Sequence, residues 1–176
     1  CDIRNEKIGS EDIGFLLGPL INAAGRVGDS ETVVTLLTAD NRPEAEALAK
    51  RLVFLNSKRK SICAEGLEKT LNKLSKSQII DEKCIVVKGD IHQGVAWIIA
   101  SRLVDMFGVP SIVFGKKKGT DGDSILVGSA RSVEGVSIVT CLRKCSILLM
   151  KYGGHDMAAG AALLEDNFSK FRSMFI

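Results

Sequence analysis

The fold is decided by residues 84–114, which read CIVVKGDIHQGVAWIIASRLVDMFGVPSIVF. The apolar run at 84–87 predicts a buried strand, and the mostly apolar segment 95–107 predicts a helix. Gly108 marks the end of that helix, and the apolar run at 111–114 predicts the next strand. Because strands that alternate with helices are typical of layered sheets, this stretch predicts an α/β fold.

The alternation continues toward the end of the sequence. A polar loop at 116–123 is followed by a predicted strand at 125–129 and a predicted helix at 137–151. A further strand is predicted at 157–164, and Asp166 is placed to cap a last helix. This half of the chain therefore predicts a layered sheet domain, whose strand order the sequence leaves open.

Helical signals dominate the residues before this domain. Ser10 is placed to cap a first helix and Ser30 a second, whereas Gly14 and the pair Gly18 and Pro19 argue against a long regular helix between them.

One long helix is predicted over 43–76, because apolar side chains recur there close to every 3.6 residues. Unbroken, it would be roughly 50 Å long. Gly66 costs about 1 kcal/mol relative to alanine and is a place for a kink or break. A helix this long and only partly apolar indicates a connector between two domains. Its other face is interpreted as a solvated basic face and carries Lys50, Arg51, Lys58, Arg59 and Lys60.

The composition restricts the class of protein. The 176 residues are 45% hydrophobic and 26% charged, as is ordinary for a soluble globular protein. No apolar run approaches the ~20 residues that span a bilayer, so no membrane contact is expected. The net charge of +3 is spread evenly along the chain, so a nucleic-acid partner would be bound by locally placed charge. Five cysteines without metal-like spacing predict free thiols and a cytoplasmic protein.

Three clusters of small residues with an arginine or a histidine are candidate phosphate sites. In the first, Asn22 and Arg26 enclose two alanines and a glycine, and these small neighbours leave the guanidinium fork unobstructed. A helix end with a surface arginine is the alternative interpretation.

The second cluster is Gly128-Ser129-Ala130-Arg131-Ser132, which directly follows a predicted strand. A turn there would offer backbone N–H groups and the hydroxyls of Ser129 and Ser132 to an anion. Arg131 would add charge and two parallel donors. The alternative is a β-turn with a surface arginine.

The third cluster is the turn Gly153-Gly154-His155, in which two glycines let the backbone approach a ligand closely. His155 would bind phosphate as imidazolium or donate from its neutral form; the alternative is a glycine turn that enters a buried strand. The other histidine, His92, either lines the same cleft or caps the helix that follows it.

The usual catalytic motifs are missing from this sequence. It contains no dense cluster of carboxylates and histidines for a two-metal phosphoesterase site. It also has no Walker-type loop and no serine nucleophile elbow. The sequence thus indicates anion-binding residues without catalytic machinery.

Taken together, these motifs resemble the C-terminal part of the RecJ-type single-strand-specific exonucleases, of the Asp-His-His (DHH) phosphoesterase superfamily. The resemblance extends from about residue 11 to 171. It rests on Gly-Pro-x-Ile-Asn-Ala-Ala-Gly-Arg at 18–26, His-Gln-Gly-Val with Ala-Ser-Arg at 92–102, Gly-Ser-x-Arg-Ser at 128–132, and the Gly-Gly-His stretch at 153–160.

The resemblance implies a division of the chain and a metal-dependent activity. Residues 1–40 would be the end of a DHH catalytic domain, 41–78 a connecting helix, and 79–176 a DHH-associated substrate-binding domain. In this family two divalent metal ions, Mn²⁺ or Mg²⁺, are bound by motifs that lie outside this chain. The family degrades single-stranded DNA from its 5′ end, and the isolated chain would be inactive.

The resemblance also implies substrate contacts by Arg26, Ser129, Arg131 and His155. The sequence departs from the family pattern at Leu20, which replaces an arginine, at Ile91, which replaces a tryptophan, and at Ala130, which replaces a glycine. Ala96 and Trp97 replace a usual Ile-Gly, and Trp97 is expected in the core.

The expected function is therefore the strand-binding half of a metal-dependent 5′→3′ exonuclease on single-stranded DNA, active in DNA repair and recombination. Accessory repair proteins are conceivable partners. The alternatives are a relative that hydrolyses short oligoribonucleotides or cyclic dinucleotides, and a non-catalytic nucleic-acid-binding module.

Overall fold

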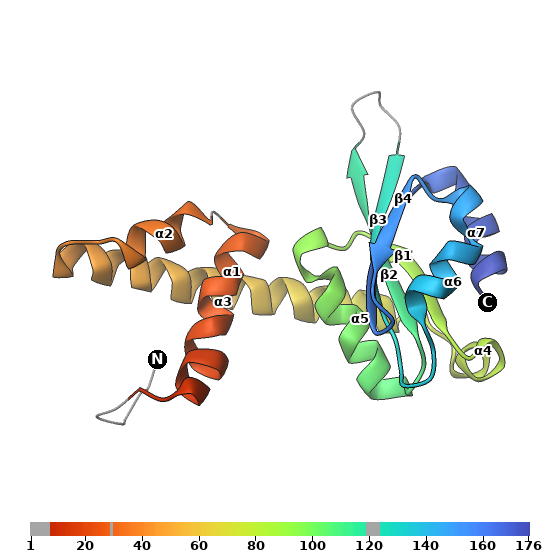
Figure 1. The fold of residues 1–176 in the computed structure, drawn as a ribbon, viewed down its shortest axis with the longest axis horizontal. Coiled ribbons are helices and arrows are strands. Elements are labelled where there is room, and N and C mark those ends of the chain that lie inside the picture. The colour runs from red at the N-terminus through yellow and green to blue at the C-terminus, as the bar shows by residue number, and fades with distance from the viewer. Residues whose placement is uncertain (1–7, 29, 119–123) are drawn as a thin grey trace. The chain divides into compact units, whose positions relative to one another are not determined.

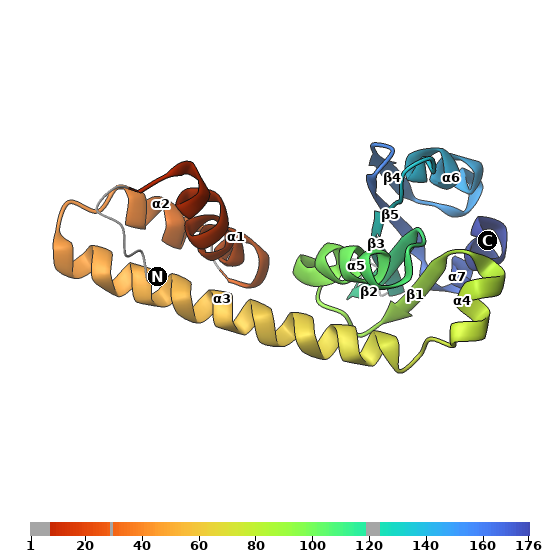
Figure 2. The ribbon, with the colours of Figure 1, turned by 90° about the horizontal axis from the view of Figure 1, so that it is seen from below.

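The computed structural model describes residues 8–28, 30–118 and 124–176. The chain forms two compact units, Cys1–Ile62 and Cys63–Ile176. Each has a hydrophobic core of its own. Helix α3, Arg42–Leu71, contributes residues to both (Figures 1 and 2).

The N-terminal unit is helical. A π-helix at Asp12–Leu17 leads directly into α1, Gly18–Val27, and α2 follows at Glu31–Leu37. The predicted interruption is therefore wrong in part, because the helix changes to the wider π form without ending. Pro19 lies at the start of α1, where the helix changes from the π to the α form. Ser30 occupies the N-cap position of α2 but makes no side-chain capping bond.

Helix α3 runs through Gly66 without the break that the glycine allowed. Gly66 is buried, and a Cβ there would lie 2.8 Å from Cδ1 of Ile99. The glycine thus serves close packing against α5, Gln93–Phe107. The helix ends at Leu71, earlier than predicted, and a separate helix α4 follows at Lys76–Glu82.

The C-terminal unit is built on a five-stranded sheet in the order β1-β2-β3-β5-β4. Strands β1 and β2 are parallel, and all other pairs are antiparallel. Helix α5 connects β1 to β2, and the views show α6, Ile138–Lys144, and α7, Phe168–Phe175, on the other side of the sheet (Figures 1 and 2). The prediction of a layered α/β domain with a long preceding helix is confirmed. The strands are β1, Ile85–Gly89; β2, Ser111–Lys118; β3, Ser124–Arg131; β4, Lys151–Gly154; and β5, Ala158–Leu164.

The core between the sheet and α7 is aromatic. The ring of Phe114 makes edge-to-face contacts with Phe168 and Phe171, at centroid distances of 5.9 and 5.5 Å. Gly128 lies opposite Phe114 in the sheet, and a Cβ there would come within 2.5 Å of the Phe114 ring. Gly128 is therefore needed for packing.

Several predicted boundaries are wrong. Strand β2 extends to Lys118 into the predicted loop, whose residues 119–123 lie outside the described part of the chain. The predicted helix at 137–151 is only α6, followed by a 3-10 turn at Ser146–Leu148 and by β4. Asp166 lies in a second 3-10 turn at Glu165–Asn167, and α7 starts without a side-chain cap.

Candidate nucleic-acid interface

Ser129 stands beside two glycines in one row of the sheet. It pairs with Gly160 on β5, and Gly160 pairs with Gly153 on β4. Because paired residues project from the same face, the part of this row on β3, β5 and β4 carries a single side chain. On the other side of Ser129 the row continues with the buried Val113 of β2. A shallow cavity of about 410 Å³ lies here, and Lys151, Gly153 and Gly160 contribute to its lining. We call the row Ser129, Gly160 and Gly153 the glycine floor.

Arg131 projects from the same face, two residues after Ser129 on β3. Its guanidinium lies over the ring of Trp97, with 5.4 Å between Cζ and the ring centroid. One guanidinium nitrogen, Nη1, donates to the carbonyl oxygen of Ala130 at 2.7 Å. Partial burial lowers the pKa of Arg131, although a guanidinium remains charged at neutral pH.

No carboxylate pairs with Arg131 among the described residues. The side chain is therefore a partly buried cation that is held in place but not neutralised. Such a group favours an anionic ligand, and its fork suits the oxygens of a phosphate.

His155 occupies the turn of the β4–β5 hairpin. Its N–H donates to the carbonyl oxygen of Ala158 at 2.8 Å, and Ala158 is the strand partner of Arg131. The turn is tied to α6, since the Ser137 hydroxyl donates to Asp156. His155 and Arg131 thus both adjoin Ala158, and the exposed His155 side chain lies at the same end of the sheet as Arg131.

Gly154 has a backbone conformation that requires glycine. Its φ is +147°, and a Cβ there would overlap the backbone of Ala158 and Ala159. The two glycines before His155 therefore have different roles: Gly154 permits the turn, whereas Gly153 is open and lies on the glycine floor.

The second predicted cluster is not a turn. Gly128 to Arg131 lie inside β3, where their backbones pair with β2 and β5. Ser132 is buried, its N–H donates to Met157, and its hydroxyl donates to the carbonyl of Val136 at 2.6 Å. Because that hydroxyl proton is already used, Ser132 is a poor anion ligand in this arrangement.

The two histidines are not brought together. His92 is the N-cap of α5, and its Nδ1 accepts from the N–H of Gly94 at 3.1 Å, as the capping interpretation predicted. Ile91, which precedes His92, contacts Gly115 on β2. Arg131 pairs with Ser111 at the start of that strand. Ser111 and Gly115 are about 13 Å apart along β2 at the usual rise of a strand.

Asn22 and Arg26 belong to the N-terminal unit and are part of α1. They are four residues apart and so share one face of the helix. Asn22 is exposed and Arg26 is half-buried in the last turn. The buried residues Ala23 and Ala24 pack against α3. The cluster is thus the end of a helix, as the alternative interpretation has it, but its arginine is half-buried and not fully on the surface.

Sequence reasoning missed two residues of this interface. Trp97 was expected in the core, but it is only partly buried and carries Arg131. Lys151 was assigned to a helix, but it begins β4 and lines the cavity beside the glycine floor. The only signal for either was the departure at Trp97 from the family pattern.

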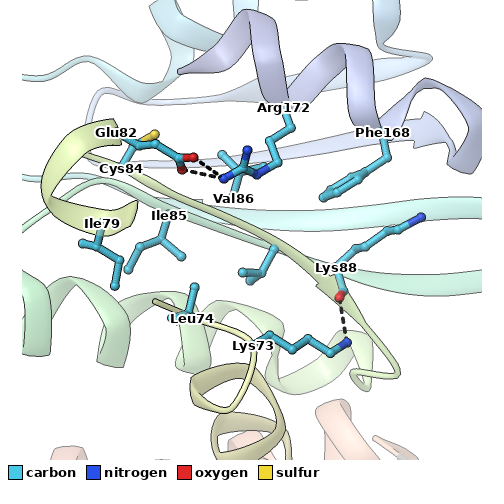
Figure 3. A pocket seen from close by; sticks show the side chains of 11 residues that line it. Lys73, Leu74, Ile79, Glu82, Cys84, Ile85, Val86, Lys88, Phe168 and Arg172 are labelled. Atoms are coloured by element: carbon cyan, nitrogen blue, oxygen red, sulfur yellow. Dashed lines mark hydrogen bonds and ion pairs between the residues drawn. The ribbon is translucent and has the colours of Figure 1, made fainter. Parts of the chain in front are cut away.

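A second cavity, of about 200 Å³, lies along β1 and contains none of the predicted site residues (Figure 3). Arg172 is paired there with Glu82, and Lys73 donates to the carbonyl of Lys88. Burial raises the pKa of the Cys84 thiol to about 11, so this thiol stays protonated at neutral pH. The arginine and Lys73 already have partners, which makes this cavity a weaker candidate for anion binding.

Metal ligands do not gather in the described part of the chain. No three His, Cys, Asp or Glu side chains come together there in a way that could hold a metal ion. Among the described helices, none is long and apolar enough to cross a membrane.

The sequence of this chain is similar to those of known exonucleases. A family model described as the DHHA1 domain matches residues 81–176. The single-stranded-DNA-specific exonuclease RecJ of Escherichia coli (strain K12) is 37% identical over 181 residues, which cover 97% of this chain and 30% of that protein. The corresponding RecJ of Salmonella typhimurium is 37% identical over 179 residues, with the same two shares.

Solved structures agree with the sequence comparison. The crystal structure of RecJ in complex with Mn²⁺ from Thermus thermophilus aligns with a TM-score of 0.81 and 33% identity. The alignment covers 93% of this chain and 24% of that one. The chain thus spans less than a third of the length of the RecJ proteins it matches here.

Proposed function

We propose, from the premise that the chain belongs to the DHHA1 domain family, that it is the strand-binding part of a metal-dependent exonuclease that degrades single-stranded DNA from its 5′ end. The observation that carries this proposal is Arg131, a partly buried cation without a carboxylate partner among the described residues, beside the glycine floor. The activity that names the RecJ relatives supports the substrate.

Each residue of the interface has a distinct role in this proposal. Arg131 binds a phosphate of the strand through its guanidinium, and Ser129 donates its hydroxyl to the same backbone. The glycine floor lets the strand approach the sheet closely, because only Ser129 of its three residues has a side chain. His155 would contact the phosphate that is cleaved.

A second group of contacts lies on α1. Arg26 and Asn22 share one face of that helix and bind a further phosphate of the strand. In this division, residues 1–40 end the catalytic domain, 41–78 connect, and 79–176 bind the substrate.

The metal ions of the reaction, Mn²⁺ or Mg²⁺, are assigned to the part of the parent protein outside this chain. The described residues do not fit such a site, since no cluster of metal-ligating side chains is found among them. We therefore assign no step of hydrolysis to these residues and expect the isolated chain to be inactive.

The cellular process, the partners and the location follow from the same proposal. A 5′ exonuclease on single strands would act in DNA repair and recombination, with accessory repair proteins as partners. Cys63, Cys84, Cys141 and Cys145 form no disulfide among the described residues, which supports a reducing, cytoplasmic location.

An NMR titration of the chain with a single-stranded DNA oligonucleotide tests the proposal. We expect the amide signals of Ser129, Gly160 and Gly153 to shift most, and those around the β1 cavity to stay in place. Shifts confined to the β1 cavity would overturn the assignment. Tighter binding of a cyclic dinucleotide than of the long strand would favour the family's small-substrate relatives instead.

A further inference from the structure

Helix α3 carries an arginine on its buried face. Leu52 and Leu55 are only 3% and 6% exposed, and they pack against Ala23 and Ala24 of α1. Arg59 follows Leu55 by four residues and therefore lies one turn further along the same face. Its side chain is half-buried rather than solvated, which corrects the interpretation of the basic face at this residue.

Two polar atoms on this face lack hydrogen-bond partners. Nε of Arg59 and Oδ1 of Asn56 are both shielded from solvent, and neither has a partner among the described residues. No ion pair involves Arg59 in that part of the chain. Buried polar groups in folded proteins are nearly always hydrogen-bonded, so the orphaned Nε–H of Arg59 indicates a ligand that supplies an acceptor. Oδ1 of Asn56 is itself an acceptor and needs a donor.

The charge around Arg59 indicates which ligand. Between Glu46 and Glu65, every charged residue of α3 is basic. This stretch of helix therefore attracts a polyanion. The guanidinium fork suits phosphate oxygens, and Asn56, three residues earlier, could add a donor there through its amide nitrogen Nδ2 but not through Oδ1.

The position of Arg59 also relates it to Arg26. The end of α1 lies against α3, since a Cβ on Gly28 would come within 2.7 Å of Leu55. Arg26 precedes that contact by two residues of α1, and Arg59 follows it by one turn of α3. The two arginines thus flank the same helix–helix contact within the N-terminal unit.

We infer that Arg59, with Asn56, binds a phosphate of the single strand and extends the site that Arg26 begins on α1. This inference rests on the proposed function, because it assumes that the strand is the ligand. It adds a contact on α3 to the proposed contacts on α1 and on β3.

Binding of a single-stranded oligonucleotide to the 176-residue chain, measured by anisotropy over a salt series, tests the inference. We expect Arg59→Ala to weaken binding about tenfold, as for a lost charge-assisted hydrogen bond, and to reduce the salt slope by about 0.7. Lys60→Ala removes the same charge from an exposed neighbour and measures the general electrostatic effect. Equal losses in the two variants would overturn the inference.

A second pair of variants keeps the test independent of folding. Asn56→Asp gives Arg59 an internal carboxylate partner, so we expect a higher thermal midpoint together with weaker oligonucleotide binding. Ser57→Asp adds the same charge at an exposed position, and it should weaken binding less and leave the midpoint unchanged.

The results separate the two proposals. If the wild-type chain does not bind the strand, the proposed function and this inference both fail. If it binds and Asn56→Asp behaves as Ser57→Asp does, only the role of Arg59 fails, and a carboxylate from elsewhere in the parent protein becomes its expected partner.

Discussion

The guanidinium of Arg131 lies over the indole ring of Trp97, at 5.4 Å from Cζ to the ring centroid. Trp97 belongs to α5 and Arg131 ends β3, so the contact joins the helix to the strand that carries Ser129. An aromatic face attracts a cation without removing its charge. The arginine is consequently held in position while it stays available to an anion.

Replacing Trp97 tests this role as a positioning residue. We expect Trp97→Leu to weaken oligonucleotide binding about fivefold, the equivalent of roughly 1 kcal/mol of cation–π attraction. Trp97→Phe keeps an aromatic face and should retain most of the affinity. The salt slope should stay the same in both variants, because Arg131 keeps its charge. A reduced slope for Trp97→Leu would contradict a purely positioning role.

The glycine floor predicts a binding defect without a folding defect. A Cβ on Gly160 would have only one neighbour within 4 Å, the carbonyl oxygen of Gly128 at 3.7 Å. Gly160→Val should therefore fold, but its side chain would cover the floor and weaken strand binding about fivefold or more, a loss of roughly 1 kcal/mol. Thermal denaturation beside the binding assay checks both parts. Unchanged affinity in the folded variant would show that the strand does not lie there.

Gly154 predicts the opposite outcome. Alanine at this position would overlap the backbone of Ala158 and Ala159 at a φ of +147°. We expect Gly154→Ala to lower the free energy of unfolding by about 1–3 kcal/mol, as measured by urea denaturation. The neighbouring Gly153→Ala meets nothing within 4 Å and should stay within about 0.5 kcal/mol of wild type. Similar losses in the two variants would refute the assigned turn geometry.

Glu165 predicts how the stability of the C-terminal unit depends on pH. Its carboxylate accepts from Lys88 at 2.8 Å, from Ser124 at 2.6 Å and from Lys116 at 3.0 Å. The hydrogen bond from Lys88, followed by those from Ser124 and Lys116, lowers the pKa of Glu165 to about 2. The ordinary pKa of a glutamate is about 4.3.

Because the folded pKa is lower than the unfolded one, the stabilisation is fully present above about pH 4.3 and is lost as the pH falls toward 2. Urea midpoints for wild type and Glu165→Gln should thus differ most at pH 6 and converge only as the pH falls below about 2. A gap that stays constant over this range would mean that the charge of Glu165 does not stabilise the fold.

The sequence predicted the elements whose signals are local. Helix α5 could be predicted from its apolar segment, its His92 cap and Gly108, which has the left-handed φ of +66° that ends a helix. Strand β4 could not be predicted, because Lys151–Gly154 is exposed and has no apolar alternation. It is a strand because it pairs with β5, and pairing depends on residues later in the chain.

The candidate site, too, could be predicted from the sequence only in part. Arg131, Ser129 and Gly153 were named from their motifs, but their shared face follows from the register of β3, β5 and β4. The contact of Arg131 with Trp97 depends on how α5 packs on the sheet, which no local pattern shows. Ser132 was misjudged, because its hydroxyl bond to Val136 forms only in the folded turn.

The proposed function depends above all on the binding of a strand phosphate by Arg131. The most direct test compares wild type with Arg131→Ala in binding a 5′-phosphorylated single-stranded oligonucleotide over a salt series. We expect wild type to bind with an affinity that falls as salt rises, and the variant to bind more weakly with a slope smaller by about 0.7, the share of one phosphate contact. Equal affinity and equal slope for the two proteins would contradict this role of Arg131.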